Sequence, residues 1–262
     1  MEEVNSVLDI SKDDKLFGDV ITLADSSADG TFLLHHFLSF FLSSNVDRPV
    51  CFVSLSQSFS HHKSVCQKLG VNLAQKIESS QLKFFDCMKT FGNRFLEIQS
   101  DNSDFASSCG DSLQGLYEEV KAYYADLQTK YATPPVVIID SLNVLLNIGH
   151  QVKAISAFIQ YLCQFILTPE SGARGTLVVF ISTGENNADE EAHLLWKRLL
   201  HMSNLDVFVS GLESGYCRDV HGKIEVKRRN CLRKKKSKSM QFKVNDKTAT
   251  FFASGMSKAV LG

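Results

Sequence analysis

The chain has 262 residues, 44% of them hydrophobic and 22% charged, a composition typical of a soluble globular protein with room for one large α/β domain or two small ones. Its formal net charge of −1 singles out no class of partner, and its acidic first residues lack the pattern of a signal peptide. No apolar run reaches the ~18 residues that a membrane-spanning helix needs, and 7 cysteines without a C-x-x-C pair favour a reducing compartment over a disulfide framework.

The first part of the chain predicts alternating strands and helices. The helix over 31–43 should be well buried, because its apolar residues recur at helical spacing on a wide face. Residues 99–112 are small and polar, which predicts a flexible surface loop. The expected elements are, in chain order, a strand over 20–24, the helix over 31–43, a strand over 50–56, a helix that ends near Gly70, and a strand over 82–86.

The second part continues this alternation and then changes. Residues 135–140 form an almost continuous β-branched run, which is typical of a strand buried on both faces. After residue 205 the pattern predicts antiparallel strands, with hairpins that turn at His221–Gly222 and Asn245–Asp246. The expected elements before these hairpins are a helix over 113–131, a strand over 135–140, a helix over 152–167, a strand over 176–182, a helix that begins near Asp189, and a strand over 205–212. The fold class is therefore α/β, a mostly parallel central sheet with helices on both faces and antiparallel edge hairpins.

A phosphate-binding loop would lie between the first strand and the first long helix. The functional pattern is G-x-x-x-x-G-K-[ST], in which the glycines expose backbone N–H groups to phosphate, the Lys reaches the outer phosphates, and the hydroxyl holds magnesium. The best alignment places Asp25 at the first glycine, Gly30 at the second, Thr31 at the Lys and Phe32 at the hydroxyl residue. An acid at the start of the loop would repel phosphate, so we predict a degenerate Walker A motif.

Asp140 ends a buried strand, as the magnesium-holding acid of a Walker B motif does. The alternative is an acid that hydrogen-bonds locally at the rim of a parallel sheet. We favour this alternative, because the Lys and the hydroxyl that would act with Asp140 are missing from the loop.

Residues 227–238 contain eight basic residues and no acid, which leaves 20 basic against 29 acidic residues in the rest of the chain. We expect a flexible loop near 227–239, between two hairpin strands. It could be a nuclear localisation signal, a solvated loop, or a loop that contacts RNA phosphates, since it has no aromatic residue for base stacking. The candidate phosphate contacts are Lys227, Arg228, Arg229, Arg233, Lys234, Lys235, Lys236 and Lys238.

Two pairs of adjacent histidines, His35–His36 and His61–His62, fall on predicted helices. Neighbouring residues on a helix point about 100° apart, so neither pair can chelate one ion well by itself. We expect no metal site, and in each pair we expect one buried and one exposed side chain.

Four long strings of sequence carry a family resemblance. They are DGTFLLHHFLSFFL (29–42), CFVSLSQSFSHHKSVCQKLGV (51–71), SGYCRDVHGKIEV (214–226) and FFASGMSKAVL (251–261). On these strings the chain resembles the Elongator complex protein 6 family, whose members are RecA-like accessory subunits of Elongator. The strings lie in order at both ends, so the resemblance spans nearly the whole chain.

The resemblance implies a single RecA-like domain over 1–262 with a degenerate nucleotide site, Ser56 at the position of the catalytic Glu, no enzymatic activity and no cofactor. It also implies a hetero-hexameric ring with Elongator proteins 4 and 5, which associates with the catalytic Elongator subcomplex, binds tRNA and supports wobble uridine modification. The expected location is the cytoplasm and nucleus, without a membrane partner. The alternative is an active RecA-family ATPase in recombination or regulation, which would need Lys in place of Thr31.

Overall fold

A computed structural model describes residues 2–89, 105–168, 173–184, 189–212, 215, 217–229, 235–245 and 248–253. Its strands form one sheet in the order β3-β2-β4-β5-β1-β6-β7-β8-β9. The six strands from β3 to β6 pair in parallel, and the last three pair antiparallel. The strands are β1 Val20–Asp25, β2 Val50–Ser54, β3 Leu82–Asp86, β4 Val136–Ile139, β5 Thr176–Ser182, β6 Leu205–Ser210, β7 Gly222–Arg229, β8 Lys235–Val244 and β9 Ala249–Phe252.

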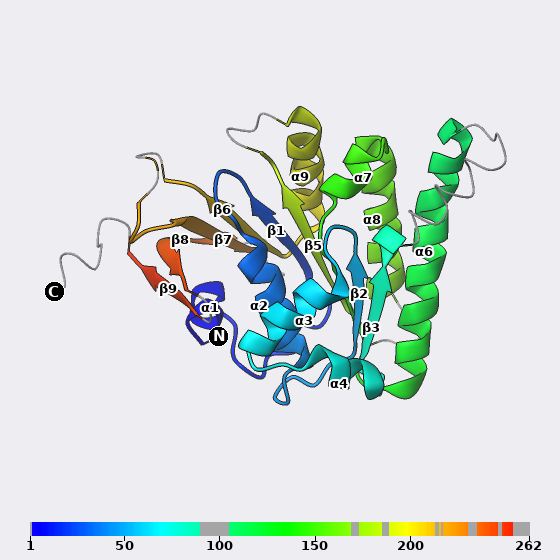
Figure 1. The fold of residues 1–262 in the computed structure, drawn as a ribbon, viewed down its shortest axis with the longest axis horizontal. Coiled ribbons are helices and arrows are strands. Elements are labelled where there is room, and N and C mark those ends of the chain that lie inside the picture. The colour runs from blue at the N-terminus through cyan, green and yellow to red at the C-terminus, as the bar shows by residue number, and fades with distance from the viewer. Residues whose placement is uncertain are drawn as a thin grey trace.

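Helices cover both faces of this sheet (Figure 1). Helices α1 to α4 contribute to one hydrophobic core and α6 to α9 to the other. The helices are α1 Glu2–Leu8, α2 Thr31–Leu42, α3 Phe59–Lys68, α4 Leu73–Glu78, α6 Phe105–Lys130, α7 Asn143–Asn147, α8 Val152–Leu167 and α9 Glu190–Met202. No helix in the described ranges is both long enough and apolar enough to cross a membrane. The predicted fold class is confirmed: the chain has a RecA-like α/β fold with an antiparallel edge.

The two cores arise from the two-residue period of the strands. In β1, Ile21 and Leu23 face the core of α1 to α4, whereas Val20 and Ala24 face the core of α6 to α9. Strands buried on both faces need apolar residues at every position, which explains the continuous runs in the sequence. Burying one such Leu or Ile side chain stabilises the fold by about 1.5–3 kcal/mol.

Arg48 lies completely buried beside the start of β2, a position that the sequence did not predict. Its guanidinium donates to the carbonyl oxygen of Pro134 at 2.7 Å and to the hydroxyl of Thr176 at 2.7 Å. The rings of Phe17 and Phe41 lie 4.7 Å and 5.5 Å from its guanidinium carbon. Burial lowers the pKa of Arg48 to about 9. Arg48 therefore ties together the amino ends of β2, β4 and β5.

The expected loop near 227–239 is wrong for most of its length. β7 continues to Arg229 and β8 begins at Lys235, and these strands pair with each other from Gly222↔Phe242 to Arg229↔Lys235. The strands continue through the basic run because their backbone groups find partners on the neighbouring strand while long charged side chains reach outward.

The expected turn at His221–Gly222 is also wrong, because Gly222 begins β7, which pairs with β6. A Cβ at Gly222 would lie 2.4 Å from the carbonyl oxygen of Ser210, so close strand approach requires this glycine. The second hairpin is confirmed: β8 and β9 are antiparallel, and the amide of Asn245 donates to the carbonyl oxygen of Thr248 at 2.7 Å.

The expected loop over 99–112 is wrong for residues 105–112, which lie in α6, and residues 99–104 lie outside the described residues. Extending an existing helix needs no new nucleus, so small polar residues can join its first turns. Helix α3 ends as expected near Gly70, which has a φ of 88°.

Candidate functional site

The turn between β1 and α2 is closed by its own carboxylate. Asp25 ends β1, and its Oδ2 accepts a hydrogen bond of 2.8 Å from the backbone amide of Gly30. The Asp25 side chain is buried, with 7% of the residue exposed. A Cβ at Gly30 would lie 3.0 Å from the Cβ of Asp25, so the glycine leaves room for this carboxylate.

The charge of Asp25 is costly in this position. Burial raises the pKa of Asp25, and hydrogen bonds from the Gly30 amide and the Ser182 side chain oppose that rise. The next amide, that of Thr31, donates to Oδ1 of Asp29 at 2.8 Å. Two amides at the start of α2, where a phosphate would bind in a nucleotide-binding loop, are therefore taken by the chain's own carboxylates.

Phe32 was predicted at the position of the magnesium-holding hydroxyl. The centroid of its ring lies 5.4 Å from that of Phe242 in β8. The side chain is partly buried and packs against the core of α1 to α4. This residue thus joins α2 to the antiparallel part of the sheet.

Asp140 follows β4 and accepts a set of hydrogen bonds from the carboxyl end of β2. Its Oδ1 accepts from the Leu55 amide at 2.7 Å, and its Oδ2 accepts from the hydroxyls of Ser54 and Ser56 at 2.9 Å and 3.0 Å. Burial alone would raise the pKa of Asp140, but the hydrogen bonds from His62, Leu55, Ser56 and Ser54 hold it below its ordinary value. The carboxylate is 2% exposed, so its acceptor capacity is spent on the chain itself.

Ser56 was predicted at the position of the catalytic Glu, and the structure brings it together with Asp140. Its amide lies 3.2 Å from both carboxylate oxygens, in addition to the contact made by its hydroxyl. A hydroxyl cannot act as a water-activating carboxylate, and this one serves instead to fix the segment after β2 to β4.

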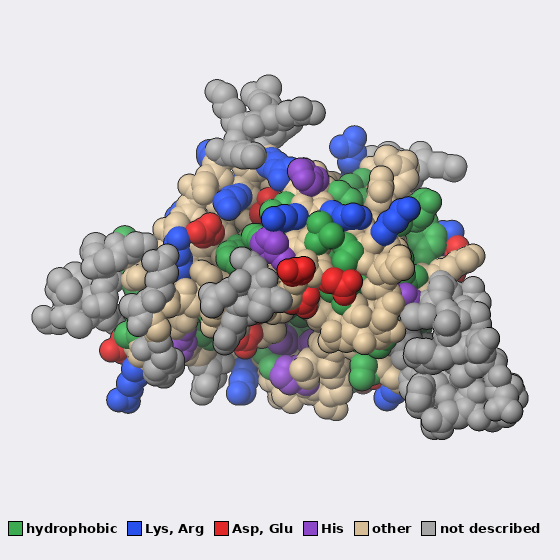
Figure 2. Space-filling model, turned by 90° about the horizontal axis from the view of Figure 1, so that it is seen from above, with side chains coloured by type: hydrophobic (Ala, Val, Ile, Leu, Met, Phe, Trp, Pro, Cys, Tyr) green, Lys and Arg blue, Asp and Glu red, His purple; other side chains and the backbone are tan. Residues whose placement is uncertain are grey.

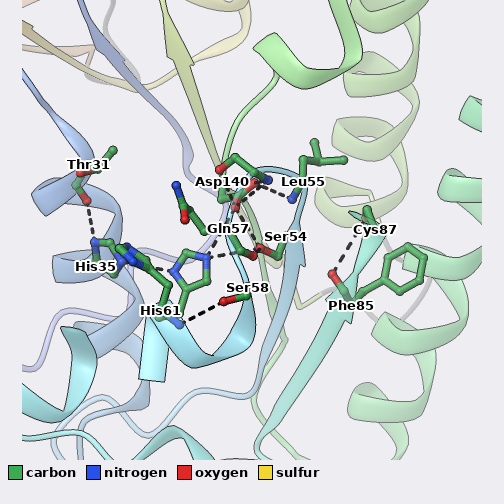
Figure 3. Close-up of polar contacts among 12 residues, drawn as sticks. Thr31, His35, Ser54, Leu55, Gln57, Ser58, His61, Phe85, Cys87 and Asp140 are labelled. Atoms are coloured by element: carbon green, nitrogen blue, oxygen red, sulfur yellow. Dashed lines mark hydrogen bonds and ion pairs between the residues drawn. The ribbon is translucent and has the colours of Figure 1, made fainter. Parts of the chain in front are cut away.

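A row of polar contacts connects these two parts of the site (Figure 3). The carbonyl oxygen of Thr31 lies 3.0 Å from Nδ1 of His35, and Nε2 of His35 lies 3.2 Å from Nδ1 of His62. Nε2 of His62 in turn lies 3.5 Å from Oδ2 of Asp140. This contact was not predicted; the signals in the sequence that could have indicated it are two serines at the end of a buried strand and a histidine pair on the next helix.

One of the two histidine pairs has one buried and one exposed side chain, as predicted. His62 is buried and His61 is exposed, as predicted, but His35 and His36 are both buried. The second of these lies under α1, where its Nε2 is 2.9 Å from Oδ1 of Asn5. Within the described ranges, no cluster of three or more His, Cys, Asp or Glu side chains could hold a metal ion.

Most of the basic side chains of this run that the structure describes lie near acids. Each of four basic side chains lies within 4 Å of a carboxylate, and Lys238 donates to the carbonyl oxygen of Ser6 at 3.1 Å. The four pairs are Lys227–Glu225, Arg228–Asp19, Arg229–Asp206 and Lys236–Asp9. The side chain of Lys235, and all of Arg233 and Lys234, lie outside what the structure describes. On the face of the molecule seen from above, Lys and Arg side chains lie among Asp and Glu side chains (Figure 2).

Comparison with known proteins identifies the family to which the chain is similar. A family model described as Elongation complex protein 6 matches residues 1–246. Proteins named Elongator complex protein 6 from Danio rerio and Homo sapiens are 40% and 36% identical to the chain, and each alignment covers 99% of both sequences. Among solved structures, an uncharacterized protein from Pyrococcus horikoshii in complex with an unknown peptide superposes with a TM-score of 0.63 at 14% identity, covering 97% of this chain and 98% of that one. That likeness concerns the fold alone.

Proposed function

The chain belongs to the Elongator complex protein 6 family, and on this premise we propose that it is a non-catalytic subunit of the Elongator complex. In the proposed assembly it packs with Elongator proteins 4 and 5 in a hetero-hexameric ring, which associates with the catalytic Elongator subcomplex. The ring binds tRNA and supports modification of the wobble uridine, in the cytoplasm and nucleus. This subunit carries out its role without a bound cofactor.

The hydrogen bond between Asp25 and Gly30 is the observation that carries the non-catalytic part of the proposal. A phosphate-binding loop must offer its amides to the phosphates of the nucleotide. Here the carboxylates of Asp25 and Asp29 lie at the start of α2. A triphosphate that entered the loop would be repelled by them, because both carry negative charge.

The surroundings of Asp140 support the same proposal. A Walker B acid must present free oxygen lone pairs to magnesium or to its water ligands. Asp140 is buried and already accepts from a backbone amide and two hydroxyls. The rival function, an active RecA-family ATPase, would require this network to open and would still lack a cation at Thr31 and a carboxylate at Ser56.

For tRNA, we propose contacts between phosphates and the more exposed members of the basic run. The side chain of Lys236 is 77% exposed, whereas that of Arg228 is 24% exposed and lies 3.2 Å from Asp19. The arginines of β7 therefore hold the hairpin to the body, and Lys236 and Lys238 of β8 are exposed members that can reach a phosphate.

Co-expression with Elongator proteins 4 and 5, followed by mass measurement of the purified assembly, tests the proposed role. The expected result is a hetero-hexamer that contains all three chains and binds tRNA. A chain that remains alone when its proposed partners are present would contradict the ring, and recovery of the ring without tRNA binding would leave assembly as its function.

A further inference from the structure

The row of contacts drawn in Figure 3 runs from α2 to the residue after β4, and its His35, His62 and Asp140 side chains are buried. His35, His62 and Asp140 are 5%, 1% and 2% exposed, so the hydrogen-bond partners of their polar atoms come mainly from one another and from nearby protein groups. The positions of the hydrogens on both rings can therefore be worked out from the groups that they face.

The carbonyl oxygen of Thr31 can accept a hydrogen bond but cannot donate one, so Nδ1 of His35, 3.0 Å away, carries a hydrogen. Burial lowers the pKa of His35 to about 4, which makes this ring neutral and leaves a lone pair on its Nε2. The atom that faces this lone pair at 3.2 Å is Nδ1 of His62, which must then carry a hydrogen.

The other nitrogen of His62 decides the charge of the ring. Its Nε2 lies 3.5 Å from Oδ2 of Asp140 and 3.3 Å from Oγ of Ser54. The hydroxyl of Ser54 has one hydrogen, and it already faces the carbonyl oxygen of Gln57 at 2.5 Å and Oδ2 of Asp140 at 2.9 Å. A lone pair on Nε2 would make a third acceptor for that single hydrogen and would point at a carboxylate. A hydrogen on Nε2 removes both conflicts.

We propose that the native chain holds one proton more than two neutral imidazoles would carry, and that this proton makes His62 an imidazolium paired with the Asp140 carboxylate. The proton is assigned to the ring because the carboxylate accepts from the Leu55 amide and from the amide and hydroxyl of Ser56, a set of donors that matches an ionised acid. The ring thus supplies, beside the Walker B-like acid, the positive charge that a metal ion would supply in a nucleotide-binding protein. The inference rests on distances within the chain and is independent of the proposed role in Elongator.

Other titratable groups lie near His35, His62 or Asp140 and affect any measurement of their protonation. They are His61 on α3, Asp29 before α2 and Cys87 after β3.

The hydrogens can be observed directly in the full-length chain labelled with ¹⁵N. Long-range ¹H–¹⁵N correlation at pH 7.5 should show both ring nitrogens of His62 in the protonated form, and His35 protonated at Nδ1 and bare at Nε2. The variants His62→Gln and His35→Gln assign the signals by their loss. A bare nitrogen on His62 in the wild-type spectrum overturns the proposal.

The assignment needs a control for histidines outside this row. His201→Gln, an exposed histidine on α9, should leave the signals of His35 and His62 unchanged. If His62→Gln does not fold, the wild-type spectrum alone decides the outcome.

Discussion

The Oδ2 atom of Asp25 accepts a hydrogen bond of 2.8 Å from the backbone amide of Gly30, so the turn before α2 encloses a carboxylate of the chain itself. Both residues were expected at glycine positions of a degenerate phosphate-binding loop, but the sequence did not indicate that they would bond to each other. The contact gives this turn a structural role, and the role can be separated from charge by substitution.

Asp25→Asn and Asp25→Ala should differ strongly in stability. Asn keeps an acceptor for the Gly30 amide and removes a charge that burial makes costly, so the free energy of unfolding should change by less than about 1 kcal/mol. Ala leaves the buried amide without its partner, which should lower the free energy of unfolding by about 1–3 kcal/mol. Urea unfolding of both variants at pH 7.5 provides the comparison, and an equal loss in both would show that the hydrogen bond is not what stabilises the turn.

Acid should destabilise the chain through its buried histidines. Burial lowers the pKa of His35 to about 4 and that of His36 to about 3, so the unfolded chain binds more protons than the folded chain below pH 6.5. The stability that these rings contribute is complete above pH 6.5 and declines as pH falls toward 4 and 3. His36→Gln should flatten the decline between pH 6.5 and 4 relative to the wild type, as measured by unfolding at several pH values.

Asp140 affects the stability of the fold at lower pH than the two histidines do. Because its pKa is held below the ordinary value of 3.8, its contribution to stability is present above that value and is lost as pH falls below it. An unchanged acid profile in His36→Gln would therefore contradict the neutral, buried state of His36 but would leave the account of Asp140 intact.

Arg48→Lys should be far more destabilising than its chemistry suggests. The guanidinium donates to the carbonyl oxygen of Pro134 and the hydroxyl of Thr176 and lies near two aromatic rings, a geometry that an ammonium cannot reproduce. With buried acceptors left unpaired, the free energy of unfolding should fall by about 3 kcal/mol or more. The matched control, Arg198→Lys on the exposed side of α9, should change it by no more than about 0.5 kcal/mol. Similar effects at both sites would mean that Arg48 is not structural.

The role of the basic run in tRNA binding can be tested in the proposed ring. Replacing Lys234, Lys235 and Lys236 by Ala should weaken binding to all tRNA sequences about equally and lower the slope of log affinity against log salt by roughly 0.7–0.9 per lost phosphate contact. Lys63→Ala, which removes an exposed lysine from α3, should leave the slope unchanged. If the triple variant keeps the wild-type slope and affinity, the run is a solvated surface or a localisation signal.

The order of most strands and helices could be predicted, because a strand that is buried on both faces has a continuous run of apolar residues in the sequence. Residues 135–140 became β4, and residues 152–167 and 176–182 became α8 and β5. The short helices α1, α4 and α7 were missed, since a few residues carry too little periodicity.

The contacts that define the site could not be predicted in this way. The ring of His62 meets Asp140 because α3 and the end of β4 converge over the same edge of the sheet, and no local pattern encodes that meeting. In the sequence, Arg48 is indistinguishable from an ordinary exposed charged residue before a strand. Its burial depends on hydrogen bonds to carbonyl groups of other segments, which the sequence does not indicate.

The absence of ATP hydrolysis is the central functional claim, and turnover by the purified full-length chain tests it most directly. With magnesium and millimolar ATP, we expect no phosphate release above that of the Asp140→Ala variant, because carboxylates occupy the loop and the acceptors of Asp140 are already used. Sustained phosphate release by the wild type that Asp140→Ala abolishes would show that the chain is an ATPase.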